Sequence, residues 1–212
     1  DKSFEEYWGY EIVFDLSKIR PKGAKISGGF KAPGPDGLRT SLEKVVELLE
    51  KRLQVSDIID SITAYDIVMH MSDAVLSGGV RRSATICLFH KSDDLMLKAK
   101  TGNWFIDNPQ RGRSNNSAVL VRSETTFEEF ENIMKSVKDF GEPGFIFTDS
   151  TEFTYNPCVE IGKYPVTDDG KTGWQGCNLT EENGAKANSP EEFYYQCYVA
   201  SAMGTLQAGY TD

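Results

Sequence analysis

Helical and strand patterns alternate along this chain, and this alternation limits its fold more than any other feature of the sequence. Apolar residues that recur every three or four positions predict helices over about 40–54, 61–76, 126–140 and from 189 onward. Short apolar runs predict strands at about 11–15, 85–89, 118–121 and 144–147. Because alternating helices and strands are typical of α/β proteins, we expect an α/β fold.

Several helix ends carry recognisable signals. Thr40 with Glu43 and Thr126 with Glu129 have capping-box spacing, which predicts a helix start at each threonine. Ser189 precedes a proline and two glutamates, the usual composition of a helix start.

Charge and composition exclude some classes of function. The 212-residue chain carries a net charge of −9, which argues against a nucleic-acid-binding surface. No apolar run approaches the length of a membrane span and no signal peptide is visible, so we expect a cytoplasmic protein with no membrane partner. The chain starts without a methionine and stops just after a helical pattern, so we expect an internal piece of a longer protein.

The cysteines are spaced in a way that argues against a metal site. Cys87, Cys158, Cys177 and Cys197 show no C-x-x-C spacing, and the chain has only two histidines, so no metal is expected. Cys87 and Cys197 lie in apolar patterns and are predicted to be core residues.

The heptapeptide 155–161 places a thiol between an amide and a carboxylate. On an extended strand, Asn156, Cys158 and Glu160 would share one face. A thiol, an acid/base group and an amide together suit chemistry on a hydroxylated substrate. The alternative is a buried cysteine in a polar turn.

Two further stretches suit anionic ligands. The loop 20–37 is rich in Gly, Pro and Lys, and its basic groups and backbone N–H groups could hold a phosphate; the alternative is a flexible connector. A double glycine followed by two arginines suits a loop that meets a nucleotide. The paired asparagines ahead of the strand at 118–121 are either turn formers or ligand-binding amides. The candidate residues are Arg20, Lys25, Ser27, Gly78, Gly79, Arg81, Arg82, Ser83, Asn115 and Asn116.

Three motifs together resemble the large catalytic subunit of ribonucleotide reductases. They are Gly78-Gly79-Val80-Arg81-Arg82-Ser83-Ala84, Asn156-Pro157-Cys158-Val159-Glu160 and Cys177-Asn178-Leu179-Thr180, in this order. The resemblance covers residues 1–212, which would be the central portion of such an enzyme, incomplete at both ends. The proline before the cysteine and the Arg-Arg-Ser-Ala and Ser-Asn-Asn-Ser-Ala runs are most similar to the adenosylcobalamin-dependent class.

The resemblance implies a fold and a set of roles. The fold would be part of a ten-stranded α/β barrel with the radical cysteine on a central finger loop. Cys158 would take the 3′ hydrogen of a ribonucleotide as a thiyl radical, Glu160 would accept the 3′-hydroxyl proton, and Asn156 would hold the ribose hydroxyls. Cys177 would be one of two cysteines that reduce the substrate and end as a disulfide. Its partner would lie upstream of residue 1, so this piece alone should not turn over.

The chemistry agrees with these roles. Acid/base groups cannot break a sugar carbon–hydrogen bond, so a cofactor, here adenosylcobalamin, must supply a radical. Two electrons must come from a dithiol, which a thioredoxin-like protein would restore. By resemblance, loop 20–37 would contact a deoxynucleotide triphosphate effector, and loop 78–84 would lie between effector and substrate base.

Three other interpretations remain open. A nucleotide-binding regulatory module without chemistry would keep both loops and leave Cys158 inert. An oxygen-dependent class I reductase large subunit would share the motifs. A simple thiol oxidoreductase is disfavoured because C-x-x-C is absent.

Overall fold

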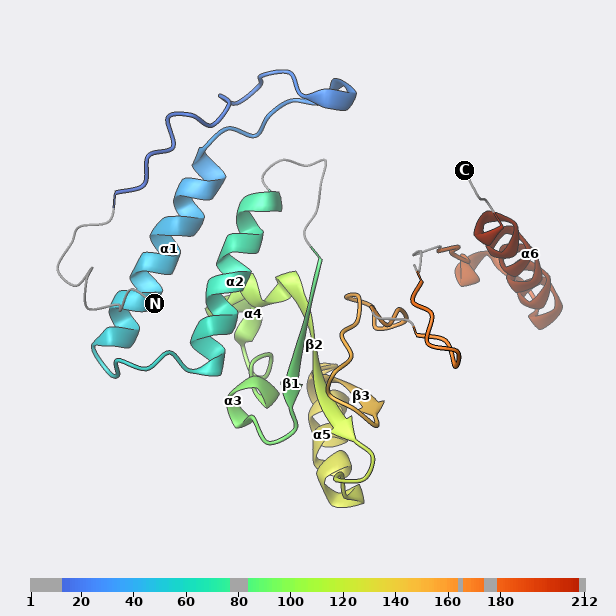
Figure 1. Cartoon of the computed structure of the whole chain (residues 1–212). Coiled ribbons are helices and arrows are strands. Elements are labelled where there is room, and N and C mark those ends of the chain that lie inside the picture. The colour runs from blue at the N-terminus through green and yellow to red at the C-terminus, as the bar shows by residue number, and fades with distance from the viewer. Residues whose placement is uncertain (1–12, 77–83, 164–165, 174–178, 210–212) are drawn as a thin grey trace. The chain divides into compact units, whose positions relative to one another are not determined.

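The computed structural model describes residues 13–76, 84–163, 166–173 and 179–209 (Figure 1). The chain divides into two compact units, Asp1–Thr151 and Glu152–Asp212. The elements of the first unit are η2 (Ser27–Gly29), α1 (Asp36–Leu53), α2 (Ser61–Leu76), β1 (Thr85–His90), α3 (Asp94–Leu97), α4 (Trp104–Asp107), η3 (Pro109–Arg113), β2 (Ser114–Val121), α5 (Phe127–Phe140) and β3 (Gly144–Thr148). The second unit contains η4 (Gly184–Lys186) and α6 (Pro190–Ala208). The predicted α/β class is confirmed.

The strands of the first unit form a parallel sheet in the order β1-β2-β3. Cys87 and Phe89 of β1 pair with Asn116 and Ala118 of β2. Leu120 of β2 in turn pairs with Phe147 of β3. Because paired residues in a parallel ladder project to the same side, these side chains share one face of the sheet.

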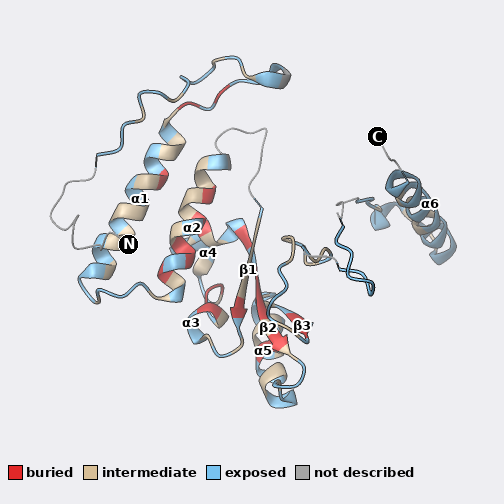
Figure 2. Ribbon diagram, viewed as in Figure 1, coloured by how far each residue is buried: buried red, intermediate tan, exposed pale blue. Residues whose placement is uncertain are grey.

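The core lies between that face and the helices α2 and α5. Tyr65 and Met69 of α2 and Ile133 of α5 belong to one buried cluster with Phe89, Ala118 and Leu120 of the strands. Buried residues, red in Figure 2, gather on α2 and on the strands. The sheet therefore receives its helices on one face.

The opposite face of the sheet is covered unevenly. Asn115 is exposed and Ile86, Leu88 and Val119 are half-buried, whereas Ser117 and, on β3, Ile146 and Thr148 are buried. Parallel sheets are usually covered on both faces, because both faces are apolar. This face therefore has the composition of a surface that is normally buried by further structure.

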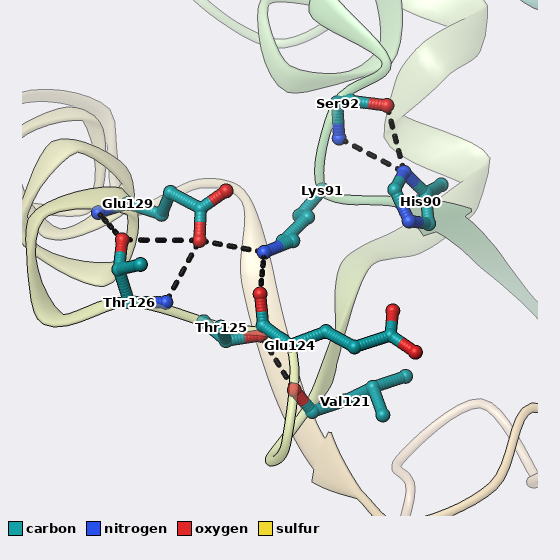
Figure 3. Close-up of polar contacts among 8 residues, drawn as sticks. All are labelled: His90, Lys91, Ser92, Val121, Glu124, Thr125, Thr126 and Glu129. Atoms are coloured by element: carbon teal, nitrogen blue, oxygen red, sulfur yellow. Dashed lines mark hydrogen bonds and ion pairs between the residues drawn. The ribbon is translucent and has the colours of Figure 1, made fainter.

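A polar cluster joins the carboxyl ends of β1 and β2 to the start of α5 (Figure 3). Lys91 donates to the Glu124 carbonyl and to Glu129 Oε2, the latter at 2.6 Å. The Thr126 N–H also donates to Glu129 Oε2, at 2.8 Å. Above all, the hydrogen bond from Lys91 lowers the pKa of Glu129 to about 2, with a further contribution from the Thr126 N–H. Lys91 thus ties two loops and a helix together.

Two of the predicted helix starts are confirmed. Thr126 and Glu129 form the expected capping box at the start of α5, and Gly141 ends that helix with a φ of 72°. The Ser189 side chain accepts from the Glu192 N–H at 3.2 Å and caps α6.

The predicted start of the first helix is wrong. Helix α1 begins at Asp36, and Thr40 lies inside it without capping anything. The N-cap is Pro35, whose φ of −81° suits a helix start, so the helix forms four residues earlier. Likewise β2 begins at Ser114, ahead of the predicted 118, and Val13–Asp15 form no strand.

The apolar stripe predicted for the last helix is not buried. None of the residues of α6 is buried, and Tyr194, Tyr195 and Leu206 each expose about two-thirds or more of their surface. A helix buries its stripe only against a packed partner, and in the described part of the second unit the other helical element is the three-residue η4. In the described residues, no helix is both long and apolar enough to cross a membrane.

Candidate functional site

The segment around Cys158 forms a short hairpin in the second unit. Tyr155 and Gly162 pair as an antiparallel bridge, and the Lys163 N–H donates to the Thr154 carbonyl at 2.8 Å. At the tip, the Val159 N–H donates to the Asn156 carbonyl at 2.9 Å, which closes a turn over Pro157 and Cys158. The expectation of an extended strand is therefore wrong. The cause is Pro157, whose fixed φ suits the second position of a β-turn.

The Asn156 side chain organises this hairpin. Its Nδ2 donates to Glu160 Oε1 at 2.7 Å, and its Oδ1 accepts from the Ile161 N–H at 3.0 Å. Its main-chain N–H also donates to the Ile161 carbonyl, at 3.1 Å. The hairpin thus brings the predicted amide and carboxylate into direct contact.

Cys158 lies at the tip of the hairpin, between these two polar groups in sequence. It is a free thiol and it is exposed, so the alternative of a buried cysteine is wrong, although its turn is present. The thiol is accessible to a reaction partner, and an acid/base group and an amide are anchored two residues away on either side.

Val159 has a backbone conformation that is rare for its residue type. Its φ is 72°, and no other non-glycine residue in the described ranges has a positive φ. A β-branched residue in this region is a genuine outlier, because its Cβ substituents crowd the backbone. Sequence reasoning missed this feature, since valine carries no signal for a left-handed position.

The predicted phosphate loop of the first unit is a hydrogen-bonded hairpin. The Gly23 N–H donates to the Ala32 carbonyl at 2.9 Å, and the Ala32 N–H donates to the Ala24 carbonyl at 2.7 Å. Gly34 has a φ of 83°, and a Cβ at this position would lie 3.0 Å from Lys22 N. Both the backbone conformation and the close approach of Lys22 therefore require glycine here.

This hairpin is basic in an acidic chain. Residues 16–39 carry six basic side chains and one acidic side chain, against a net charge of −9 for the whole chain. The candidate residues Arg20, Lys25 and Ser27 are all exposed. The hairpin is therefore a local positive surface that suits an anion.

Several candidates lie outside the described residues. They are Gly78, Gly79, Arg81, Arg82, Ser83 and Cys177.

The paired asparagines lie on β2 and not in a turn, so their interpretation as turn formers is wrong. Asn115 is exposed on the unevenly covered face, whereas Asn116 is 2% exposed on the core face. The Asn116 Oδ1 accepts from Ser114 Oγ at 2.7 Å and lies 3.1 Å from the Tyr65 hydroxyl. Its buried Nδ2 has no hydrogen-bond partner. Burial raises the pKa of Tyr65.

A buried ion pair beside these asparagines escaped sequence reasoning. Arg111 donates to both carboxylate oxygens of Asp66, at 2.8 and 2.7 Å, and to the Ala99 carbonyl at 2.8 Å. Nearby, Lys100 is 4% exposed and donates to Glu142 Oε1 at 2.9 Å. The partners are 45 and 42 residues apart in sequence, so no local pattern could reveal them.

Cys87 packs against the core cluster as a half-buried residue, and burial raises the pKa of its thiol. Cys197 is half-buried on α6. In the parts of the chain that the structure describes, no group of three or more His, Cys, Asp or Glu side chains could hold a metal ion.

Comparison with known proteins adds the family context. The chain is 31% identical over 187 residues to the adenosylcobalamin-dependent ribonucleoside-triphosphate reductase of Lactobacillus acidophilus, a match that covers 87% of this chain and 24% of that protein. The enzyme of the same name from Lactobacillus leichmannii is 30% identical over 185 residues, covering 86% of this chain and 24% of the enzyme. That of Lactobacillus gasseri is 34% identical over 137 residues, covering 64% and 18%. Neither a family model nor a solved structure matches the chain.

The matches confirm the predicted resemblance. The chain spans about a quarter of the length of the curated relatives it matches.

Proposed function

We propose that this chain, which is similar to about a quarter of an adenosylcobalamin-dependent ribonucleoside-triphosphate reductase, is a central part of the catalytic portion of a ribonucleotide reductase. The single observation that supports this most is the Cys158 hairpin. It presents an exposed thiol together with an anchored amide and carboxylate inside the segment that matches the reductases.

The proposed roles follow from the chemistry of the three groups. Cys158, as a thiyl radical, takes the 3′ hydrogen atom of the ribose, and the thiol re-forms while the radical passes to the sugar. Glu160 accepts the 3′-hydroxyl proton. Asn156 holds a ribose hydroxyl, for which its Nδ2 retains a second hydrogen and its Oδ1 a second lone pair beyond the bonds to Glu160 and Ile161.

A cofactor that generates a radical can pass it to Cys158 only if the thiol is accessible. Adenosylcobalamin, when bound, supplies the initiating radical. The exposed Cys158 fits the role of acceptor of that radical in the chain.

The electrons for reduction come, in this proposal, from a cysteine pair. Cys177 supplies one thiol, and a cysteine outside this chain supplies the other. Replacement of the 2′-hydroxyl by hydrogen, with release of water, takes two electrons and two protons from the pair, which is left as a disulfide. A thioredoxin-like protein reduces this disulfide again by thiol–disulfide exchange. Reduced thiols persist in the cytoplasm, where we place the protein.

The basic hairpin 16–39 is proposed to bind the triphosphate of a deoxynucleotide effector. Its surplus of basic side chains and its exposed Arg20 and Lys25 support this. The loop 78–84 is proposed to lie between effector and substrate base.

The sheet supports the proposed barrel. Its three parallel strands carry helices on one face, and the other face is only partly covered. In a closed ten-stranded α/β barrel this second face would point inward, with the Cys158 hairpin as the finger loop.

The test uses the complete gene product that carries this chain. With adenosylcobalamin and a dithiol, it should reduce ribonucleoside triphosphates, and Cys158→Ser should abolish turnover while nucleotide binding survives, because a serine hydroxyl cannot carry the radical. Cys197→Ser is the matched control, since it makes the same change on α6 and should retain turnover.

Two outcomes would contradict the proposal. Residual turnover in Cys158→Ser above a few per cent of that of the wild type would remove Cys158 from the radical role. Activity that needs a separate metal-bearing radical subunit and no cobalamin would assign the chain to the oxygen-dependent class.

A further inference from the structure

Val159 lies between the thiol and the carboxylate of the hairpin, and its left-handed backbone is unusual for a valine. The residues that adopt a φ near 72° without strain are glycine and, less readily, asparagine. A strained residue persists only where its surroundings determine its conformation, and such residues cluster at functional sites. The hydrogen bonds around Val159 show what determines it.

The Asn156 main-chain carbonyl accepts from the Val159 N–H, at 2.9 Å. The Ile161 N–H donates to the Asn156 side-chain Oδ1, at 3.0 Å. For both bonds to form, the chain must reverse between the end of the turn and Ile161. The left-handed conformation at Val159 makes this reversal.

The same reversal places Glu160. Its Oε1 accepts from Asn156 Nδ2 at 2.7 Å. The Oδ1 of the same amide group accepts from the Ile161 N–H. One amide group of Asn156 therefore contacts both the carboxylate and the Ile161 backbone.

We propose that Val159 is a positioning residue: its left-handed backbone, and not its side chain, returns the chain from the Cys158 turn so that Asn156 meets both Glu160 and Ile161. The thiol, the carboxylate and the amide are then pre-arranged before a substrate arrives. This inference rests on the proposed function for its catalytic meaning. Only the kinetic test below depends on that function, whereas the structural test does not.

The structural test measures amide hydrogen exchange of Ile161 by NMR in the 212-residue chain. The variants are Val159→Asn, Val159→Gly, Val159→Ala and Val159→Ile. If the backbone conformation closes the hairpin, Val159→Asn and Val159→Gly should slow exchange of the Ile161 amide by about threefold or more. Val159→Ala should slow it less, and Val159→Ile should match the wild type. The reason is that the ease of entering the left-handed region falls from glycine and asparagine through alanine to isoleucine. The reverse order, with Ile best and Gly worst, would overturn the proposal, because the side chain would then close the hairpin.

The kinetic test uses the complete gene product. Val159→Pro fixes φ near −65° and removes the N–H that closes the turn, so kcat should fall about 100-fold with little change in KM. Val159→Asn should lose less than about tenfold, since the geometry survives. A loss in Val159→Asn as large as in Val159→Pro, with Val159→Ile active, would overturn the proposal. Should Cys158→Ser prove active, the proposed function fails, yet the order of exchange rates still decides the role of Val159.

Discussion

At the scale of single residues, Arg111 and Asn156 each hold several groups together. Arg111 links Asp66 on α2 to the Ala99 carbonyl, and Asn156 links Glu160 to the Ile161 backbone. Both use the geometry of a planar group that can bind two partners at once. They differ in solvent exposure. The Arg111–Asp66 pair is largely shielded from solvent, whereas Cys158 and Glu160 of the hairpin are exposed.

The burial of the Asp66–Arg111 pair leads to a stability prediction. Asp66→Ala leaves the guanidinium uncompensated, and such a change typically costs about 3–5 kcal/mol. Glu47→Ala is the matched control, because it removes an ion pair with Lys51 of similar length on an exposed helix surface, worth under about 0.5 kcal/mol. Urea unfolding of the 212-residue chain, followed by circular dichroism, measures both. Equal losses in the two variants would contradict the assignment of the Asp66 pair to the core.

The Glu129 carboxyl group leads to a pH prediction. Its pKa falls from 4.5 to about 2 in the folded chain, chiefly because Lys91 donates to it. A group with a lowered folded pKa stabilises the fold above its unfolded pKa, and this contribution is lost as pH falls from about 4.5 towards 2. Glu129→Gln should therefore be less stable than the wild type at pH 7, and the difference should shrink over that range.

Thermal unfolding at a series of pH values checks this expectation. Glu128→Gln, on the same exposed first turn of α5, serves as the control and should show a smaller effect. A constant difference between wild type and Glu129→Gln down to pH 2 would contradict the role of the charged carboxylate.

At the scale of elements, helix starts decide where the loops begin. The sequence contains two capping boxes of equal quality, yet only Thr126 caps a helix, while Thr40 lies inside α1. Pro35 and Asp36 start α1 before Thr40 is reached. The last two residues of the glycine- and proline-rich stretch 20–37 thereby belong to α1, and the stretch runs directly into this helix.

This difference can be measured with two threonine variants. Thr126→Ala removes a cap and should cost about 1 kcal/mol. Thr40→Ala exchanges an exposed helix-interior threonine for a better helix former, and it should be neutral or stabilising by up to about 0.5 kcal/mol. Urea unfolding gives both values. A loss in Thr40→Ala as large as in Thr126→Ala would contradict the observed start of α1.

At the scale of the whole molecule, the two units differ in how they are stabilised. Every member of the buried core cluster lies in the first unit. In the second unit, α6 has no buried residue. Among the described residues, the buried core cluster therefore includes none of residues 152–212.

A chain that ends at Thr151 should accordingly keep the cooperative unfolding of the first unit. Its melting midpoint should stay within about 3 °C of that of the 212-residue chain, roughly the shift that 1 kcal/mol produces in a domain of this size. Differential scanning calorimetry measures both chains. A larger drop, or loss of the transition, would show that residues 152–212 contribute to the core.

The sequence by itself determined the α/β class, the positions of α2, α5 and β3, and the caps at Thr126 and Ser189, because periodicity and capping act between residues close in sequence. It also singled out Asn156, Cys158 and Glu160, since their residue types carry the chemistry. The tertiary structure alone decided that these three lie on a turn held by Asn156, with Val159 left-handed. The tertiary structure alone also determined the Asp66–Arg111 pair and the packing of α2 and α5 on one face of the sheet. The physical reason is that these features depend on contacts between distant segments and on which acceptor each backbone N–H meets in the folded turn, and a residue pattern records neither.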